Sequence, residues 1–292
     1  MQDIVRAAAV SVESHPGQTR ENLRQIDEWA ARAADAGAQL VLFQELSMTG
    51  FIPNHPTADH DQWLRAALGV ARQAAEPVDG AAVSSLVEVA RRRNILIAAG
   101  MLEDAGNLLF NTHVLVGPEG ILGSFRKMHV PMFEMPFYNG GDAPTVVETP
   151  LGRIGVNICF DSLLPESTRL LAVQNVEIVL FPFAADPPPC TPAGWAKWAA
   201  PALQSRCVEN GVFGLACNFV GRVKCANVEQ FFPGGGIAIG PRGEVLKEWD
   251  VPTGEPGMLI AEFKADDLRQ ARSEPEYLFR FRRPELYRSL AR

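Results

Sequence analysis

The sequence has few cysteines, no long hydrophobic run and no stripe of basic residues. Its five cysteines are an odd number, without CxxC spacing or nearby paired histidines, so we expect neither a disulfide framework nor a zinc site. This cysteine usage favours a reducing, cytoplasmic location. No apolar run reaches the roughly 18 residues that suggest a membrane span. The first residues lack the basic segment and apolar core of a signal peptide.

The charge balance excludes another class of partner. The chain carries 27 Lys+Arg against 34 Asp+Glu, a formal net charge of −7, and its basic residues are scattered. Because nucleic-acid binding requires clustered Lys and Arg against phosphates, we expect no nucleic-acid partner. At 292 residues, with 47% hydrophobic residues, the chain is long and apolar enough to bury a core without disulfides or metal.

Short apolar runs alternate with longer amphipathic runs along the chain. The short runs predict strands, and runs with apolar residues every three or four positions predict helices. Strands are predicted at residues 4–12, 40–43, 95–101, 108–116, 121–126, 146–149, 153–158, 178–182, 213–217, 236–239, 245–249 and 258–263. Helices are predicted at residues 18–36, 61–76, 80–93, 165–174, 195–210 and 265–271. This alternation alone favours one α/β domain with a large mixed sheet.

Three polar residues share one setting, at points where the chain leaves a predicted strand. They are Glu45, Lys127 and Cys159. Ligands of open α/β sheets bind beyond the carboxyl ends of the strands. A carboxylate, an ammonium and a thiol are therefore expected to meet at one edge of the sheet.

The chemistry of these groups suggests a thiol hydrolase. Cys159 lies in a turn whose backbone N–H groups, together with a nearby ammonium, favour a thiolate. A thiolate attacks a carbonyl carbon, and the Lys127 ammonium and the Phe160 amide could stabilise the resulting oxyanion. Glu45 could take the thiol proton and later activate water. Glu134, in the loop after Lys127, is a second acid that could orient the substrate.

Spacing alone leaves simpler interpretations open. A lone cysteine after an apolar strand is commonly an inert core residue, and a lone charge at a strand end is commonly solvated. The aromatic residues of the loop after Lys127 could serve only to pack it. The proline-rich segment 186–190 could be only a stiff connector.

The residues around these positions resemble three motifs of the nitrilase, or carbon–nitrogen hydrolase, superfamily. Residues 43–51 (FQELSMTGF) resemble its glutamate motif, residues 126–131 (RKMHVP) its lysine motif and residues 155–161 (GVNICFD) its cysteine motif. The three occur in the order of the family. Glu134, followed by the Gly-Gly-Asp of residues 140–142, is similar to the family's second glutamate and the end of its loop.

The resemblance implies a four-layer αββα sandwich in place of a single mixed sheet. It implies a hydrolase domain over residues 1–272 and a homodimer or higher homo-oligomer. Residues 273–292 resemble a C-terminal arm that could cross a subunit interface, and a frayed end is the alternative. It also implies roles for the triad: Glu45 as general base, Lys127 as stabiliser of the tetrahedral intermediate and Cys159 as nucleophile. The reaction implied forms a thioester, releases ammonia or an amine, and requires no metal and no organic cofactor.

Two departures from the family patterns bear on the substrate. Cys159 is followed by Phe-Asp, which is closer to the amidase and carbamoylase branches than to nitrilases, where Trp-Glu is more frequent. The arginine that N-carbamoyl-amino-acid hydrolases carry after this motif is absent from residues 162–164. We therefore expect a small neutral or apolar amide as substrate. The candidate substrate-binding residues are Phe133, Tyr138, Phe160 and Asp161.

Other functions remain open at this point. An N-carbamoyl amine or amino-acid amidohydrolase is the first alternative, and a nitrilase is the second. A catalytically silent relative that binds a ligand is the alternative from another class. An unreactive Cys159, together with no ammonia release from any amide, would favour this last alternative.

Overall fold

The structure, a computed structural model, describes residues 1–55 and 57–291. Within that range the strands form two six-stranded sheets and a separate hairpin. The first sheet has the order β14 (Gly257–Lys264), β1 (Ile4–Ser11), β2 (Leu40–Phe43), β3 (Leu96–Asp104), β4 (Leu109–Gly117) and β5 (Gly120–Arg126). The second has the order β13 (Val245–Glu248), β12 (Gly236–Ile239), β9 (Phe213–Cys217), β8 (Ile178–Pro182), β7 (Gly152–Val156) and β6 (Val146–Thr149).

Each sheet has parallel strands at its centre and antiparallel strands at its edges. Strands β1, β2 and β3 are parallel, as are β7, β8 and β9. The expected hairpin-like pairs β3–β4 and β12–β13 are both antiparallel. Residues that follow a central strand of either sheet therefore leave it at a carboxyl end, where α/β folds bind ligands.

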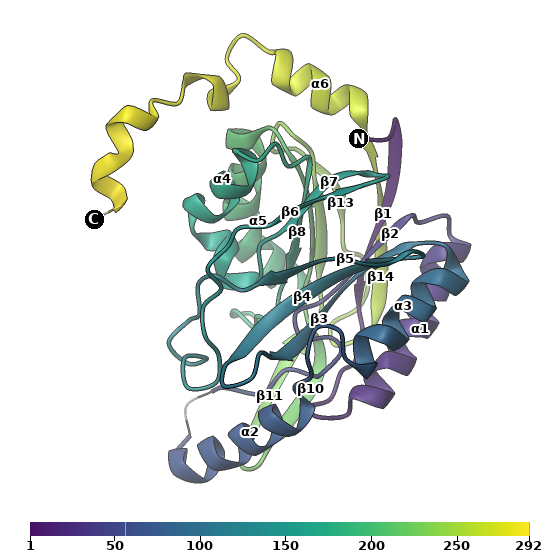
Figure 1. Cartoon of the computed structure of the whole chain (residues 1–292), viewed down its shortest axis with the longest axis vertical. Coiled ribbons are helices and arrows are strands. Elements are labelled where there is room, and N and C mark those ends of the chain that lie inside the picture. The colour runs from purple at the N-terminus through teal and green to yellow at the C-terminus, as the bar shows by residue number, and fades with distance from the viewer. Residues whose placement is uncertain (56, 292) are drawn as a thin grey trace.

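Helices cover the outer face of each sheet, which gives four layers (Figure 1). Helices α1 (Thr19–Asp35) and α3 (Ala81–Arg93) pack on the first sheet. Helices α4 (Pro165–Ala172) and α5 (Pro192–Asn210) pack on the second. Helix α2 (His60–Ala74) lies beside the hairpin of β10 (Val220–Cys225) and β11 (Val228–Pro233).

Strand β1 shows why the sandwich forms. Ala7 and Ala9 belong to the core between the two sheets, whereas Ala8 and Val10 belong to the core between the first sheet and its helices. Side chains alternate between the faces of a strand, so an entirely apolar strand requires cover on both faces. The inner cover comes from residues such as Ile178 of the second sheet.

The chain ends in helix α6 (Ala265–Ser273) and two short 3-10 helices, η2 (Leu278–Phe281) and η3 (Pro284–Ala291). Helix α6 packs on the sandwich, with Leu268 in the core between the sheets, and the yellow segment arches over one end of the molecule in Figure 1. Tyr277 ties it to the body through a hydrogen bond from its hydroxyl to the Asn210 carbonyl, at 2.9 Å. Arg292, the last residue of the predicted arm, lies outside the described residues.

The αββα architecture is confirmed, and the single mixed sheet that periodicity alone favoured is wrong. The sequence prediction also missed the β10–β11 hairpin and ended β7 two residues late, because Asn157 and Ile158 already form the turn into Cys159. No helix in the described part of the chain combines the length and apolarity that crossing a membrane requires.

Candidate active site

The three motif residues come from both sheets. Glu45 follows β2 and Lys127 follows β5 of the first sheet, while Cys159 follows β7 of the second and begins the 3-10 helix η1 (Cys159–Leu163). Glu134 lies in the loop between β5 and β6. The sandwich therefore brings the carboxyl ends of strands from two sheets to one place.

A buried ammonium links two carboxylates. Lys127 Nζ donates to Glu45 Oε1 at 2.8 Å and to Glu134 Oε2 at 2.7 Å. The side chains of Lys127 and Glu45 are 0% exposed, and that of Glu134 is 7% exposed. An ammonium has three N–H donors, so two are occupied by the carboxylates and one remains to serve a substrate.

The two oxygens of Glu45 have different surroundings. Oε1 also accepts a hydrogen bond from Asn111 Nδ2 at 2.7 Å, so two donors hold it in place. Oε2 is buried and has no hydrogen-bond partner among the described residues. A buried carboxylate oxygen without a donor is costly, and it is available to accept a proton.

The turn that carries Glu45 is held against β3. Leu46, the next residue, has a φ of +52°, in the left-handed region that non-glycine residues rarely adopt. Met48 N donates to the Gly100 carbonyl at 2.8 Å. Gly100 is needed for this approach, because a β-carbon there would overlap the Leu46 nitrogen. Before the turn, the buried amide of Gln44 exchanges two hydrogen bonds with the Val12 backbone.

Cys159 also sits at a strained position, with a φ of +47°. Strained backbone of this kind is concentrated at functional sites, where the surrounding structure enforces it. Desolvation, followed by the negative charges of Glu45 and Glu134, raises the pKa of the Cys159 thiol well above its usual value, although the Lys127 charge acts in the opposite direction. This shift opposes the expectation that the turn favours a thiolate, and it makes a base that takes the thiol proton more important.

The same charges act on the other members of the cluster. Desolvation and the Glu45 charge raise the pKa of Glu134 from 4.5 to about 7, against the opposing pull of the Lys127 ammonium. The carboxylates of Glu134 and Glu45 raise the pKa of Lys127 well above its usual value, although burial alone would lower it. Lys127 therefore stays charged, while Glu134 exchanges its proton near neutral pH.

Asp161 joins the lysine and cysteine motifs. Its Oδ1 accepts from the His129 amide at 2.8 Å, and its Oδ2 accepts from the amides of Met128 at 3.3 Å and Ile158 at 3.2 Å. His129 Nδ1 lies 2.8 Å from Oδ1, and this contact raises the pKa of His129. The Asp161 side chain is 1% exposed. With both oxygens occupied by the protein, Asp161 fits a positioning role better than the direct substrate contact we expected.

A pocket of about 390 Å³ opens beside Cys159. Its aromatic lining consists of Phe133, Phe160 and Trp198. Its polar lining consists of Asn54, His55, Glu134, Asp186 and Gln230. Among the described residues the lining includes neither lysine nor arginine.

The pocket contains two of the four expected substrate-binding residues. Phe133 and Phe160 line it, and they are 48% and 38% exposed. Tyr138 is 5% exposed and packs beside Phe137, so it supports the loop rather than the pocket. The segment that begins with Asp186, which the sequence left as a possible connector, supplies part of the wall.

Sequence reasoning did not identify Asn111, His55 or Trp198. Asn111 had a weak signal, since it is a polar residue within the predicted strand 108–116. His55 and Trp198 had none, because they come from a loop and from helix α5, which only the folded chain brings to Cys159.

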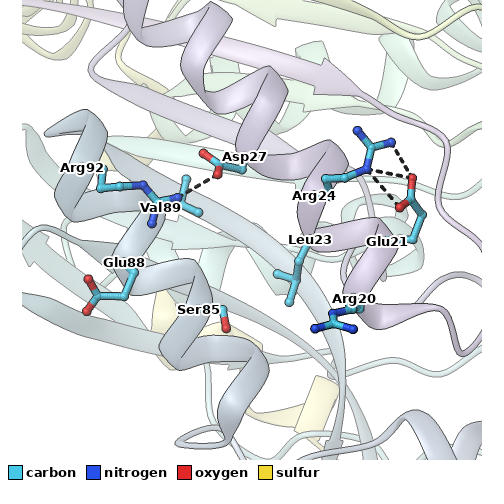
Figure 2. Close-up of a pocket in the computed structure, with 9 residues that line it drawn as sticks. All are labelled: Arg20, Glu21, Leu23, Arg24, Asp27, Ser85, Glu88, Val89 and Arg92. Carbon is cyan, nitrogen blue, oxygen red and sulfur yellow. Dashed lines mark hydrogen bonds and ion pairs between the residues drawn. The ribbon is translucent and has the colours of Figure 1, made fainter.

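A second hollow, of about 540 Å³, lies between helices α1 and α3, which cover the outer face of the first sheet (Figure 2). It shares no residue with the Cys159 cluster. Two pairs of its charged side chains are bonded to each other, Arg24 with Glu21 and Arg92 with Asp27. In the described residues no group of three or more His, Cys, Asp or Glu side chains is arranged to hold a metal ion.

Comparisons with known proteins point in one direction. A family model described as carbon-nitrogen hydrolase matches residues 6–273. A nitrilase from Pyrococcus abyssi is 29% identical over 286 residues, which cover 97% of this chain and 99% of that protein. An (R)-stereoselective amidase from Pseudomonas sp. is 30% identical over 271 residues, which cover 92% of this chain and 88% of that protein.

The fold has solved counterparts. A mutant of an amidase from Nesterenkonia sp. AN1 matches with a TM-score of 0.76 and 27% identity, over 98% of this chain and 96% of that one. That structure shows covalent addition of the acetamide moiety of fluoroacetamide at its active-site cysteine.

Proposed function

This chain belongs to the carbon–nitrogen hydrolase family, whose model matches residues 6–273, and from that membership we propose that it hydrolyses small amides through a thioester on Cys159. As a family member it is an amidase-type hydrolase of C–N bonds. The observation that carries the assignment of residues is the buried Glu45–Lys127–Glu134 cluster beside the cysteine, with one oxygen of Glu45 and one donor of Lys127 unoccupied.

The first step requires a base, because the Cys159 pKa is raised. Glu45 Oε2 accepts the thiol proton, and the sulfur attacks the amide carbonyl carbon. The C=O electron pair moves to oxygen and forms a tetrahedral oxyanion. The third N–H of Lys127 and the amide of Phe160, which has no acceptor within η1, are the donors placed for that oxyanion.

The second step breaks the C–N bond. Glu45 returns the proton to the leaving nitrogen, so ammonia or an amine departs and the thioester remains. Water then loses a proton to Glu45 and attacks the thioester carbon. The acid product leaves as the proton returns to the Cys159 sulfur, which restores the starting thiol.

Glu134 and Asp161 support this chemistry in different ways. Glu134 binds the Lys127 ammonium together with Glu45 and also lines the pocket, where it can orient the amide. Asp161 fixes the Lys127 loop relative to the turn that carries Cys159. A displacement of about 1 Å between nucleophile and oxyanion donors costs an enzyme about 100-fold in rate, so this positioning matters.

Ammonia release tests the proposal directly. The panel comprises small amides, N-carbamoyl amines, N-carbamoyl amino acids and nitriles, with the Cys159→Ala protein as control. We expect amides to be the preferred class and the substitution to abolish release. Equal ammonia release by the two proteins would contradict the role of Cys159, and a preference for carbamoyl compounds or nitriles would reassign the substrate class.

We also propose that the protein is a cytoplasmic homodimer or higher homo-oligomer. Apolar side chains are exposed on α4, directly after it and on the described part of the C-terminal segment, including Leu170, Val173, Leu278 and Phe281. An exposed apolar surface of this kind suits contact with a second copy of the chain. In this proposal residues 1–272 form the hydrolase domain and residues 273–292 form an arm at the subunit interface. The five free cysteines suit a reducing cytoplasm. Light scattering of the purified protein tests the oligomer.

A further inference from the structure

The wall of the Cys159 pocket includes a carboxylate that the proposed reaction does not use. Asp186 lines the pocket, and its side chain is 23% exposed. His55 also lines the pocket, and its Nε2 lies 2.8 Å from Asp186 Oδ2. The His55 side chain is 50% exposed, and imidazole is a weaker counter-charge at neutral pH than lysine or arginine.

The protein holds Asp186 in place from both sides. The preceding residue, Ala185, exchanges two hydrogen bonds with the buried amide of Asn218, at 2.9 and 2.8 Å. Beyond the prolines, Thr191 caps helix α5 by accepting from the Gly194 amide at 3.0 Å. A carboxylate anchored in this way is pre-organised for a ligand.

Aromatic rings complete the setting. Phe133, Phe160 and Trp198 line the same pocket and are 48%, 38% and 42% exposed. Aromatic faces attract ammonium and guanidinium groups, and a nearby carboxylate adds a direct charge interaction. A carboxylate bound to the substrate would instead face Asp186 and Glu134 with neither lysine nor arginine in the described lining.

We propose that Asp186 and the aromatic residues around it form a cation subsite that selects amides whose acyl chain carries a distal ammonium group. The proposal rests on the proposed function, because it names the substrate class of the same pocket. Cys159 attacks the amide at one end of the substrate, and Asp186 binds the ammonium at the other end.

Binding and turnover test this separately. Affinity is measured by calorimetry in the Cys159→Ala protein, which does not consume the ligand, for three compounds of similar length: 5-aminopentanamide, hexanamide and the monoamide of glutaric acid. We expect the cationic amide to bind about tenfold more tightly than the neutral amide, because a partly exposed ion pair contributes an energy of this size. The anionic amide should bind most weakly. A series from 3-aminopropanamide to 6-aminohexanamide measures the reach of the subsite.

Variants then assign the preference to Asp186. Asp186→Asn should remove most of the preference for the cation. His55→Gln removes the competing imidazole and should increase the preference, so it tests the proposal even if Asp186→Asn folds poorly. Glu229→Gln is the matched control, since Glu229 is an exposed carboxylate next to the lining residue Gln230 and pairs with Arg222. It should leave the preference unchanged.

Several outcomes would overturn the subsite. The first is an equal affinity for the cationic and the neutral amide. The second is a preference for the cationic amide that persists in folded Asp186→Asn protein. The third is an equal loss of this preference in Glu229→Gln. Turnover by the wild-type protein reports on the proposed function instead. If the cationic amide binds selectively but no amide is hydrolysed, the cation subsite is supported and the proposed function is contradicted. If amides are hydrolysed without a preference for the cation, the proposed function is supported and the subsite is contradicted.

Discussion

Replacement of Lys127 by methionine is the sharpest test of the buried charge cluster. Methionine has similar length and no charge, so Lys127→Met removes the ammonium without opening a large cavity. It leaves Glu45 and Glu134 facing a position that no longer carries a positive charge. In the wild-type protein the ammonium lies 2.8 Å from one carboxylate and 2.7 Å from the other, with both partners buried.

The magnitude follows from the cost of leaving charges buried. Removing one partner of a buried ion pair typically destabilises a protein by about 3–5 kcal/mol, because the remaining charge loses its compensation. Here two carboxylates remain, so at pH 7.5 we expect a loss of about 4 kcal/mol in the free energy of unfolding. Without Lys127 the pKa of Glu134 rises further, and the folded variant binds more protons than its unfolded chain. The loss should therefore become smaller as the pH falls to 5.

Urea unfolding at fixed protein concentration measures this loss at the two pH values. The double variant Lys127→Met/Glu134→Gln is the informative companion, because it leaves only one uncompensated carboxylate. We expect it to be more stable than the single variant at pH 7.5, by about 1 kcal/mol or more. A loss below 1 kcal/mol for Lys127→Met, or the same loss at both pH values, would refute the electrostatic reasoning.

Three further predictions address the groups around this cluster. Burial raises the pKa of Glu134 from 4.5 to about 7, so between these pH values the folded protein holds a proton that the unfolded chain has lost. As the pH rises from 4.5 to 7, the free energy of unfolding of the wild-type protein should therefore fall by about 3 kcal/mol relative to that of Glu134→Gln. The same pH dependence in the denaturation curves of the two proteins would contradict this. NMR titration should give a raised pKa for His129, and this pKa should be lower in Asp161→Asn. The ion pair between His129 and Asp161 should be lost as the pH rises through the raised value. An unchanged titration in the variant would show that Asp161 does not hold the ring. Gly100→Ala should reduce both stability and kcat/KM by displacing the turn after β2, whereas the control Gly69→Ala, in α2 with open space around it, should stabilise the protein by about 1 kcal/mol. Equal effects of the two alanines would indicate that Gly100 has no special role.

The strands could be predicted better than the sheets. An apolar run such as 40–43 reads as a buried strand whether it belongs to one large sheet or to the inner layers of a sandwich, since both arrangements bury both faces. Alternate residues of β1 contact different cores, and that division becomes visible only once the second sheet is placed. The motif resemblance, rather than periodicity, predicted the four layers.

The hairpin β10–β11 had a readable signal that was missed. Exposed residues such as Arg222 and Lys224 alternate with buried ones along β10, and Ala226 with Asn227 forms the turn into β11. Period-two alternation with a short polar turn is typical of a hairpin. Its importance lies in Gln230, which brings this element to the pocket wall.

Their positions at the ends of predicted strands indicated that Glu45, Lys127 and Cys159 would meet, but not how their charges would balance. The raised pKa of Cys159 depends on two buried carboxylates and on the amount of solvent around the thiol, and neither follows from spacing. Asp161 shows the same limit of a pattern. Its proximity to Cys159 in sequence suggested contact with substrate, whereas its oxygens are occupied by backbone amides.

The central claim is a covalent acyl intermediate on Cys159, and acid-quenched mass spectrometry measures it most directly. Wild-type protein is mixed with excess of a turned-over amide, quenched within the steady state and digested. The account predicts the mass of the acyl group on the peptide that contains Cys159, and its absence, together with loss of ammonia release, in Cys159→Ala. Steady turnover with no acyl mass on that peptide and with activity retained in Cys159→Ala would contradict it.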